Sequence, residues 1–84
     1  MEYETKVTLD LRGELIPLAL LKFTETLRET EADRILEVLT ADDTTISKLL
    51  MVLQAFPHEI ISMERDGPIH RILLRKKAYR DNGY

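Results

Sequence analysis

The feature that most constrains the fold of this 84-residue chain is a repeated change in the spacing of its apolar residues. They recur at every second position in the first such segment, which is typical of a half-buried strand, and then at every third or fourth position, which is typical of a helix. The expected strands span 6–11, 34–40, 58–65 and 69–77, and the expected helices begin at Pro17 and at Asp42-Asp43. The sequence therefore predicts the element order β-α-β-α-β-β.

This order predicts a two-layer α/β (α+β) sandwich. A strand, a helix and a strand in succession favour a right-handed crossover, and Asp66-Gly67 is typical of a hairpin that pairs the last two strands. Two helices can cover only one face of a four-stranded sheet, so the other face is left open. We expect one domain over residues 1–84, with a mixed sheet, a core over about 5–78 and a frayed tail at 79–84.

The expected helices differ in how clearly they begin. Asp42 and Asp43 are good N-caps, and this role explains the two adjacent carboxylates better than acid–base catalysis does. Ile16 stands where the first helix needs its cap, although it offers no side-chain oxygen. The apolar spacing places a buried stripe on each helix. The first stripe is Leu20, Leu21, Thr24 and Leu27, with Phe23 flanking it, and the second is Ile46, Leu49, Leu50, Leu53 and Phe56.

The absence of cysteine limits the chemistry more than any other aspect of composition. It excludes disulfides, thiolate nucleophiles, persulfide carriers and cysteine-bound metals. Neither a Ser/His/Asp constellation nor a phosphate loop is present, so we expect no catalytic residues and no cofactor. His58 and His70, even with Glu59, provide too few converging ligands for a zinc site, so we expect no metal.

The cellular location is predicted from the lack of targeting and membrane-spanning segments in the sequence. Residues 1–4 are acidic and lead into no apolar run of signal-peptide length, and the most apolar stretch, 15–21, is too short to cross a bilayer. We therefore expect a cytoplasmic protein that does not interact with membranes.

The stretch from Leu9 to Lys22 resembles the signature of the SirA/TusA sulfur-carrier family. That signature reads Leu-Asp, two residues, Gly, two residues, Cys-Pro, then a second Pro and a helix carrying a lysine. The resemblance extends over roughly residues 7–77 and implies the family's fold. Its landmarks in this chain are Leu9-Asp10, Gly13, Pro17, Lys22, Leu36–Leu39, Asp42-Asp43 and Pro57–Ile61.

Three departures accompany this resemblance. The family's cysteine lies just before the first helix, where a helix N-terminus lowers a thiol's pKa, and here that position is Ile16. Ala19 replaces the second proline, and Pro57 replaces a glycine. Isoleucine has no lone pair and no titratable proton, so it cannot carry sulfur. The resemblance thus implies a member that has lost the relay cysteine.

The leading hypothesis is a non-enzymatic protein-binding or regulatory module linked to sulfur trafficking. Family members pass persulfide sulfur from a desulfurase to acceptors in tRNA thiolation, cofactor synthesis or sulfur oxidation, so the resemblance implies a sulfur-transfer or regulatory protein as partner. We expect the former cysteine site to be the contact surface. Its residues are Gly13, Glu14, Ile16, Pro17 and Lys22.

An alternative hypothesis is a nucleic-acid-binding module. Residues 65–84 hold six basic and two acidic side chains, and Arg71, Arg75 and Lys77 share one face of the last strand, with Lys76 opposite. Sheets that bind RNA also carry aromatic side chains for base stacking, and only Tyr79 is close. The other explanation of these cations is an edge strand protected by charge against aggregation. A monomer or a weak homodimer is expected, the latter through Ile35 and Leu39 on the open face.

Overall fold

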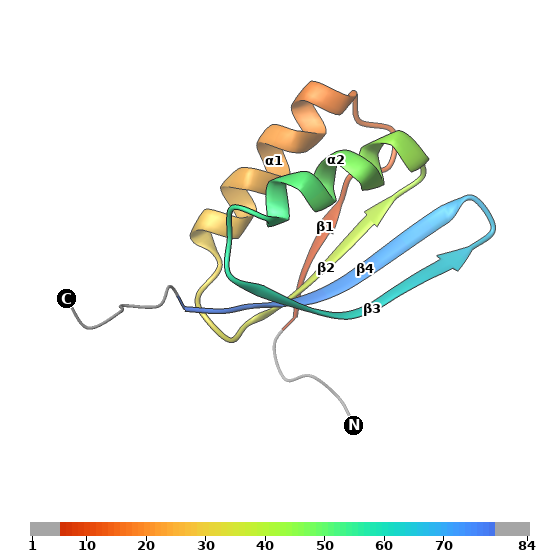
Figure 1. Cartoon of the computed structure of the whole chain (residues 1–84). Helices are drawn as coiled ribbons and strands as arrows, with labels where there is room; N and C mark the ends of the chain where they lie inside the picture. The colour runs from red at the N-terminus through yellow and green to blue at the C-terminus, as the bar shows by residue number, and fades with distance from the viewer. Residues whose placement is uncertain (1–5, 79–84) are drawn as a thin grey trace.

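Six elements follow one another in the predicted order in the computed structural model, which describes residues 6–78 (Figure 1). The expected frayed tail, 79–84, lies outside the described residues. The strands are β1 (Lys6–Asp10), β2 (Ile35–Thr40), β3 (His58–Asp66) and β4 (Ile69–Lys76), and the helices are α1 (Ile16–Glu29) and α2 (Asp43–Leu53).

The four strands form one mixed sheet in the order β1-β2-β4-β3. β1 and β2 are parallel, whereas β2 with β4 and β4 with β3 are antiparallel. Both helices lie on one face, which confirms the two-layer sandwich (Figure 1). The expectation that the last strand is an edge was wrong, because the chain passes from α2 to the far side of the sheet and the hairpin then returns β4 to a place beside β2.

The core lies between the sheet and the helices. β2 and β4 contribute alternate residues to it, and the helices contribute residues four apart. The expected stripe on α1 was wrong in part, because Leu21 is exposed and the buried residues are Ala19, Phe23 and Leu27. The buried apolar side chains of this core are Leu11, Ala19, Phe23, Leu27, Leu36, Val38, Leu49, Leu53, Ile72 and Leu74, and Ile35 is buried outside it.

Two local structures fix the ends of elements. The Asp42 side chain accepts from the Thr44 N–H at 2.8 Å, so the predicted cap of α2 is confirmed. In the hairpin, the turn lies one residue later than expected, since Asp66 pairs with Ile69 within the ladder. Gly67 adopts a φ of +61° as the first central residue, which side-chain-bearing residues rarely do, and the fixed φ of Pro68 suits the second position.

Lys76 is a buried cation on the helix face of β4, opposite the face of Arg71 and Arg75, as predicted. Only 8% of it is exposed. Its Nζ donates to the backbone carbonyl oxygens of Leu27 and Arg28 in the last turn of α1. A cation is favourable there because helix-end carbonyls lack partners within the helix and the dipole is negative at that end.

Within residues 6–78, the helices are all too short or too polar to span a membrane.

Candidate functional site

The site predicted from the sequence begins at the loop between β1 and α1. The backbone N–H of Leu11 donates to Leu39 at 2.8 Å, and the N–H of Glu14 donates to the Leu11 carbonyl at 3.2 Å. Gly13 has a φ of +82° with no atom within 4 Å of a built Cβ. The loop is therefore a tight turn that needs glycine for its backbone conformation rather than for space.

An ion pair holds the start of this turn. Arg12 Nε and Nη2 donate to the two carboxylate oxygens of Asp10 at 2.9 and 2.7 Å, and the Arg12 backbone N–H donates to Asp10 Oδ1 at 3.0 Å. The side-chain hydrogen bond, followed by the backbone one, lowers the pKa of Asp10 from 3.8 to about 2. The same pairing raises the pKa of Arg12.

α1 starts one residue earlier than predicted. Leu15, not Ile16, is the N-cap, and Ile16 is the first helical residue, followed by Pro17. Leu15 gives no side-chain hydrogen bond to the first turn. Pro17 has no N–H to satisfy, so the helix leaves the donors of Ile16 and Leu18 without a side-chain cap. The helix can begin at Ile16 because proline suits the first turn and removes one donor that would otherwise need a partner.

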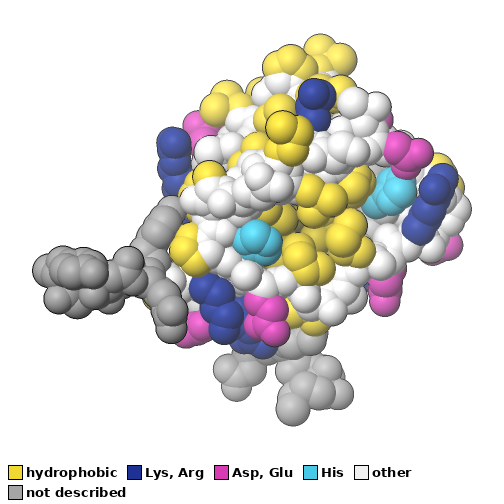
Figure 2. Space-filling model, in the orientation of Figure 1, with side chains coloured by type: hydrophobic (Ala, Val, Ile, Leu, Met, Phe, Trp, Pro, Cys, Tyr) yellow, Lys and Arg dark blue, Asp and Glu magenta, His cyan; other side chains and the backbone are white. Residues whose placement is uncertain are grey.

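Large apolar side chains surround this helix start and point to solvent. Leu15 is 78% exposed, Leu18 44% and Leu21 53%. With Ile16 and Pro17 they form the surface that we call the α1 tip. Figure 2 shows apolar side chains at the top of the molecule, where α1 begins in Figure 1. Exposed leucines clustered on one helix end are typical of a protein contact surface.

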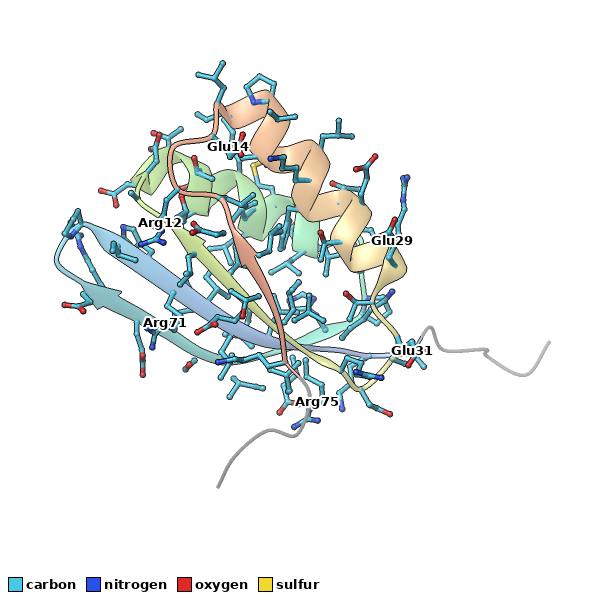
Figure 3. All side chains as sticks on the ribbon, turned by 180° about the vertical axis from the view of Figure 1, so that it is seen from behind. Arg12, Glu14, Glu29, Glu31, Arg71 and Arg75 are labelled. Carbon is cyan, nitrogen blue, oxygen red and sulfur yellow. The ribbon has the colours of Figure 1, made fainter. Side chains whose placement is uncertain are left out.

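Glu14 and Lys22 lie beside the α1 tip and bind each other. Lys22 Nζ is 2.6 Å from Glu14 Oε2, which ties the turn to the second turn of the helix (Glu14 is labelled in Figure 3). The structure thus brings together the five residues predicted for the site, from Gly13 to Lys22. Sequence reasoning did not single out Leu15 and Leu18, and it assigned Leu21 to the buried stripe of the helix.

The predicted basic face is balanced by carboxylates. Arg71 Nε lies 3.2 Å from Glu37, and Arg71 Nη1 lies 3.6 Å from Glu64. Arg75 and Lys77 both face Glu59, at 3.5 and 3.8 Å. Lys77 lies one residue beyond β4, so it extends the face rather than belonging to the strand. Figure 3 shows Arg71 and Arg75 spaced along the sheet, away from the helix start.

The open face combines ion-paired charges with the apolar side chains of Ile35 and Leu39. Of its described positions none is aromatic, and Tyr79 lies outside the described residues. Glu37 also binds Lys6 at 3.3 Å and accepts from Thr8 at 3.0 Å, so the ion pairs continue across to β1. Ile35 lies on this face but is already buried within the single chain.

The two histidines lie at opposite ends of the β3–β4 hairpin. His58 pairs in register with Lys76, and His70 pairs with Arg65. His58 Nδ1 lies 2.7 Å from the Phe56 carbonyl, and His70 Nε2 lies 2.5 Å from Asp43 Oδ1. Among the described residues, no group of three potential metal ligands comes together.

A hollow of about 500 Å³ lies at the turn end of the open face. Arg12 and Arg71 line it, and both are already paired with carboxylates. Across residues 6–78, every buried side-chain nitrogen and oxygen has a hydrogen-bond partner. No buried side-chain polar atom in this range is therefore left for a ligand to satisfy.

Comparison with known proteins agrees with this architecture. The family model described as "Sulfurtransferase TusA" matches residues 7–76. A protein of Archaeoglobus fulgidus named "Putative sulfur carrier protein" is 26% identical over 70 residues, covering 83% of this chain and 96% of its own length.

Two solved structures share the fold. The crystal structure of a SirA-like protein from Desulfitobacterium hafniense has a TM-score of 0.66 at 19% identity and covers 86% of this chain and 99% of its own. A solution structure from Helicobacter pylori has a TM-score of 0.60 at 22% identity, with coverages of 84% and 97%. On the strength of the family match, this chain belongs to the TusA family of sulfurtransferases, and it does so without a cysteine among its 84 residues.

Proposed function

We propose that this chain is a partner-binding module of sulfur trafficking that docks through the α1 tip and does not itself carry sulfur. By the resemblance to the family signature, Ile16 occupies the position of the relay cysteine. The single observation that supports docking is the exposure of Leu15, Leu18 and Leu21 around that position. Such a surface can occupy the docking site of a sulfur donor without accepting its sulfur.

The physical argument rests on what the surface offers. Isoleucine and leucine side chains gain free energy when they leave water, at about 25 cal/mol per Å² of apolar area. The Glu14–Lys22 pair beside them places one negative and one positive charge at the rim of the surface. Complementary charges on a partner would fix the orientation in which it docks. No proton-transfer or nucleophilic group lies at the centre of the α1 tip, which is consistent with a binding role.

The test is a competition experiment. A cysteine desulfurase loaded with persulfide passes sulfur to a cysteine-bearing member of the family, and the rate is followed by intact mass with increasing amounts of this chain. We expect the wild type to slow the transfer while gaining no sulfur mass. Leu18→Asp, which places a charge in the α1 tip, should abolish the inhibition.

Met51→Asp is the matched control, because Met51 is an exposed apolar residue on α2, 67% exposed against 44% for Leu18. It should inhibit as the wild type does. Equal loss of inhibition in both variants would show that the α1 tip has no special role, and sulfur found on the wild-type chain would refute the non-carrier assignment.

A further inference from the structure

β3 is the long free edge of the sheet. It spans nine residues and pairs only with β4, whereas the other edge strand, β1, spans five. The outer side of β3 therefore presents a row of backbone N–H and C=O groups with no neighbouring strand in the part of the chain that the structure describes. Such an edge is a template on which another extended chain can pair.

The helix-side face of β3 is apolar and uncovered. The buried core contains no residue of β3, and Ile60 and Met63 are 36% and 49% exposed. A groove of about 230 Å³ adjoins Met63. Its apolar lining is Ile46, Met63 and Ile72, and its polar lining is Glu64, Arg65, His70 and Arg71. Figure 2 shows this apolar patch between the two histidines, below α2 in the view of Figure 1.

The opposite face of the same strand is acidic at its outer edge. Glu59 pairs in register with Arg75, and Glu64 with Arg71. Both carboxylates already belong to long ion pairs with cations on the β4 side, but they are 57% and 63% exposed, so an added strand would share them from the outer side. A strand added outside β3 would place its own residues directly opposite these two glutamates. Opposite charges at such positions stabilise pairing and like charges destabilise it, so basic residues are favoured there. On the other face, apolar residues are favoured opposite Ile60 and Met63 because the groove can take them.

A second copy of this chain fits the edge poorly. An antiparallel pairing of two β3 strands that keeps the apolar faces together sets Ile60 against Met63 of the second copy. The same register sets Glu59 against Glu64 of the second copy. These directly opposed like charges disfavour self-pairing.

We propose that the outer edge of β3 binds an extended segment of a protein partner as an added strand, in which basic side chains alternate with apolar ones. The basic side chains pair with Glu59 and Glu64, and the apolar side chains contact Ile60, Met63 and the groove. This site is separate from the α1 tip. A result that excludes strand binding at β3 therefore leaves the proposed docking through the α1 tip untouched, and the reverse also holds.

The probe is a synthetic peptide of the length of β3 that alternates valine and lysine, and its control alternates valine and glutamate. Binding is followed by amide chemical shifts of the isotope-labelled chain at millimolar peptide. We expect the lysine peptide to shift the amides of residues 58–66 and the glutamate peptide to leave them unchanged. A lysine peptide with alternate backbone nitrogens methylated keeps its charge but cannot pair as a strand, and it should not bind.

The double variant Glu59→Lys/Glu64→Lys should bind the lysine peptide with roughly tenfold lower affinity, because two favourable charge pairs become unfavourable. It should also bind the glutamate peptide, which the wild type does not. The matched control Glu25→Lys/Glu29→Lys changes the net charge equally but on the exposed side of α1. It should keep the wild-type preference.

Three results would overturn the proposal. Equal weakening in both variants would reveal unspecific attraction to an acidic protein. Amide chemical-shift changes confined to residues outside β3, or no changes with the lysine peptide, would show that the edge accepts no such strand. A doubled mass by light scattering, with β3 amides protected in the peptide-free protein, would assign the edge to a second copy.

Discussion

Lys76 provides the sharpest test of how α1 is held in place. Its ammonium group is buried and donates to the carbonyls of Leu27 and Arg28 at the end of that helix. Lys76→Met keeps the length and the aliphatic contacts of the side chain but removes the charge and the donors. The helix-end carbonyls then lose a cation interaction worth up to about 2 kcal/mol and charged hydrogen bonds worth about 1.5–3 kcal/mol.

The desolvation cost of the ammonium group opposes these losses, since the variant no longer buries a charge. We expect a net decrease of about 2 kcal/mol in the free energy of unfolding. In a chain of 84 residues this corresponds to a fall in Tm of roughly 8–16 °C. Urea denaturation followed by circular dichroism measures the change, with an unchanged m value as the sign that the folded state is retained.

The matched control is Lys77→Met, one residue further along. Lys77 is exposed, and its contact with Glu59 spans 3.8 Å, so its loss should change stability by no more than about 0.5 kcal/mol. A Lys76→Met variant as stable as the wild type would show that the burial cost of the charge cancels its hydrogen bonds. The account of α1 anchoring given above would then be wrong.

Three further predictions concern the start of α1. Gly13→Ala should cost about 1–2 kcal/mol in urea denaturation because of the φ of +82°, and Gly13→Asn should cost less; equal costs would point to sterics instead. Because its pKa is lowered, the Asp10 carboxylate stabilises the fold fully above about pH 4 and loses this contribution as the pH falls toward 2. The difference in unfolding free energy between wild type and Asp10→Asn should therefore vanish over that range. A difference that grows on acidification would contradict the pairing with Arg12. Ile16→Cys should take up sulfur from a persulfide donor, since its thiol would lie at the uncapped start of a helix, whereas Met51→Cys within α2 should react more slowly; equal rates would show that the helix start does not activate the thiol.

Much of the fold follows from local patterns. The alternation over residues 6–11 and the apolar run over 34–40 identified two strands, and Asp42 identified the start of α2. The place of β4 between β2 and β3 did not follow, because the hydrophobic pattern of a strand does not specify its neighbours. The charges on β4 resembled edge protection, yet their role is to pair with glutamates on β2 and β3.

The candidate site was likewise predictable in part. The position of Gly13, Ile16 and Pro17 at one helix start followed from the signature and the helix pattern. The rotation of α1 did not, because leucine at both 20 and 21 fits two overlapping stripes. Ala19 decides between them: it is fully buried, and with Phe23 and Leu27 it forms the stripe that packs into the core. That choice leaves Leu18 and Leu21 in solvent, and it creates the α1 tip.

The same topology accounts for the second surface. Because β4 lies inside the sheet, Arg71 and Arg75 have acidic neighbours, and the charges that looked available for nucleic acid are already bound by Glu37, Glu59 and Glu64. The insertion of β4 also displaces β3 to a position that the helices do not cover. The central position of β4 thus accounts both for the neutralised basic face and for the exposed apolar side chains of β3. The α1 tip and β3 both keep apolar side chains in contact with water, and we therefore expect recognition at these two surfaces.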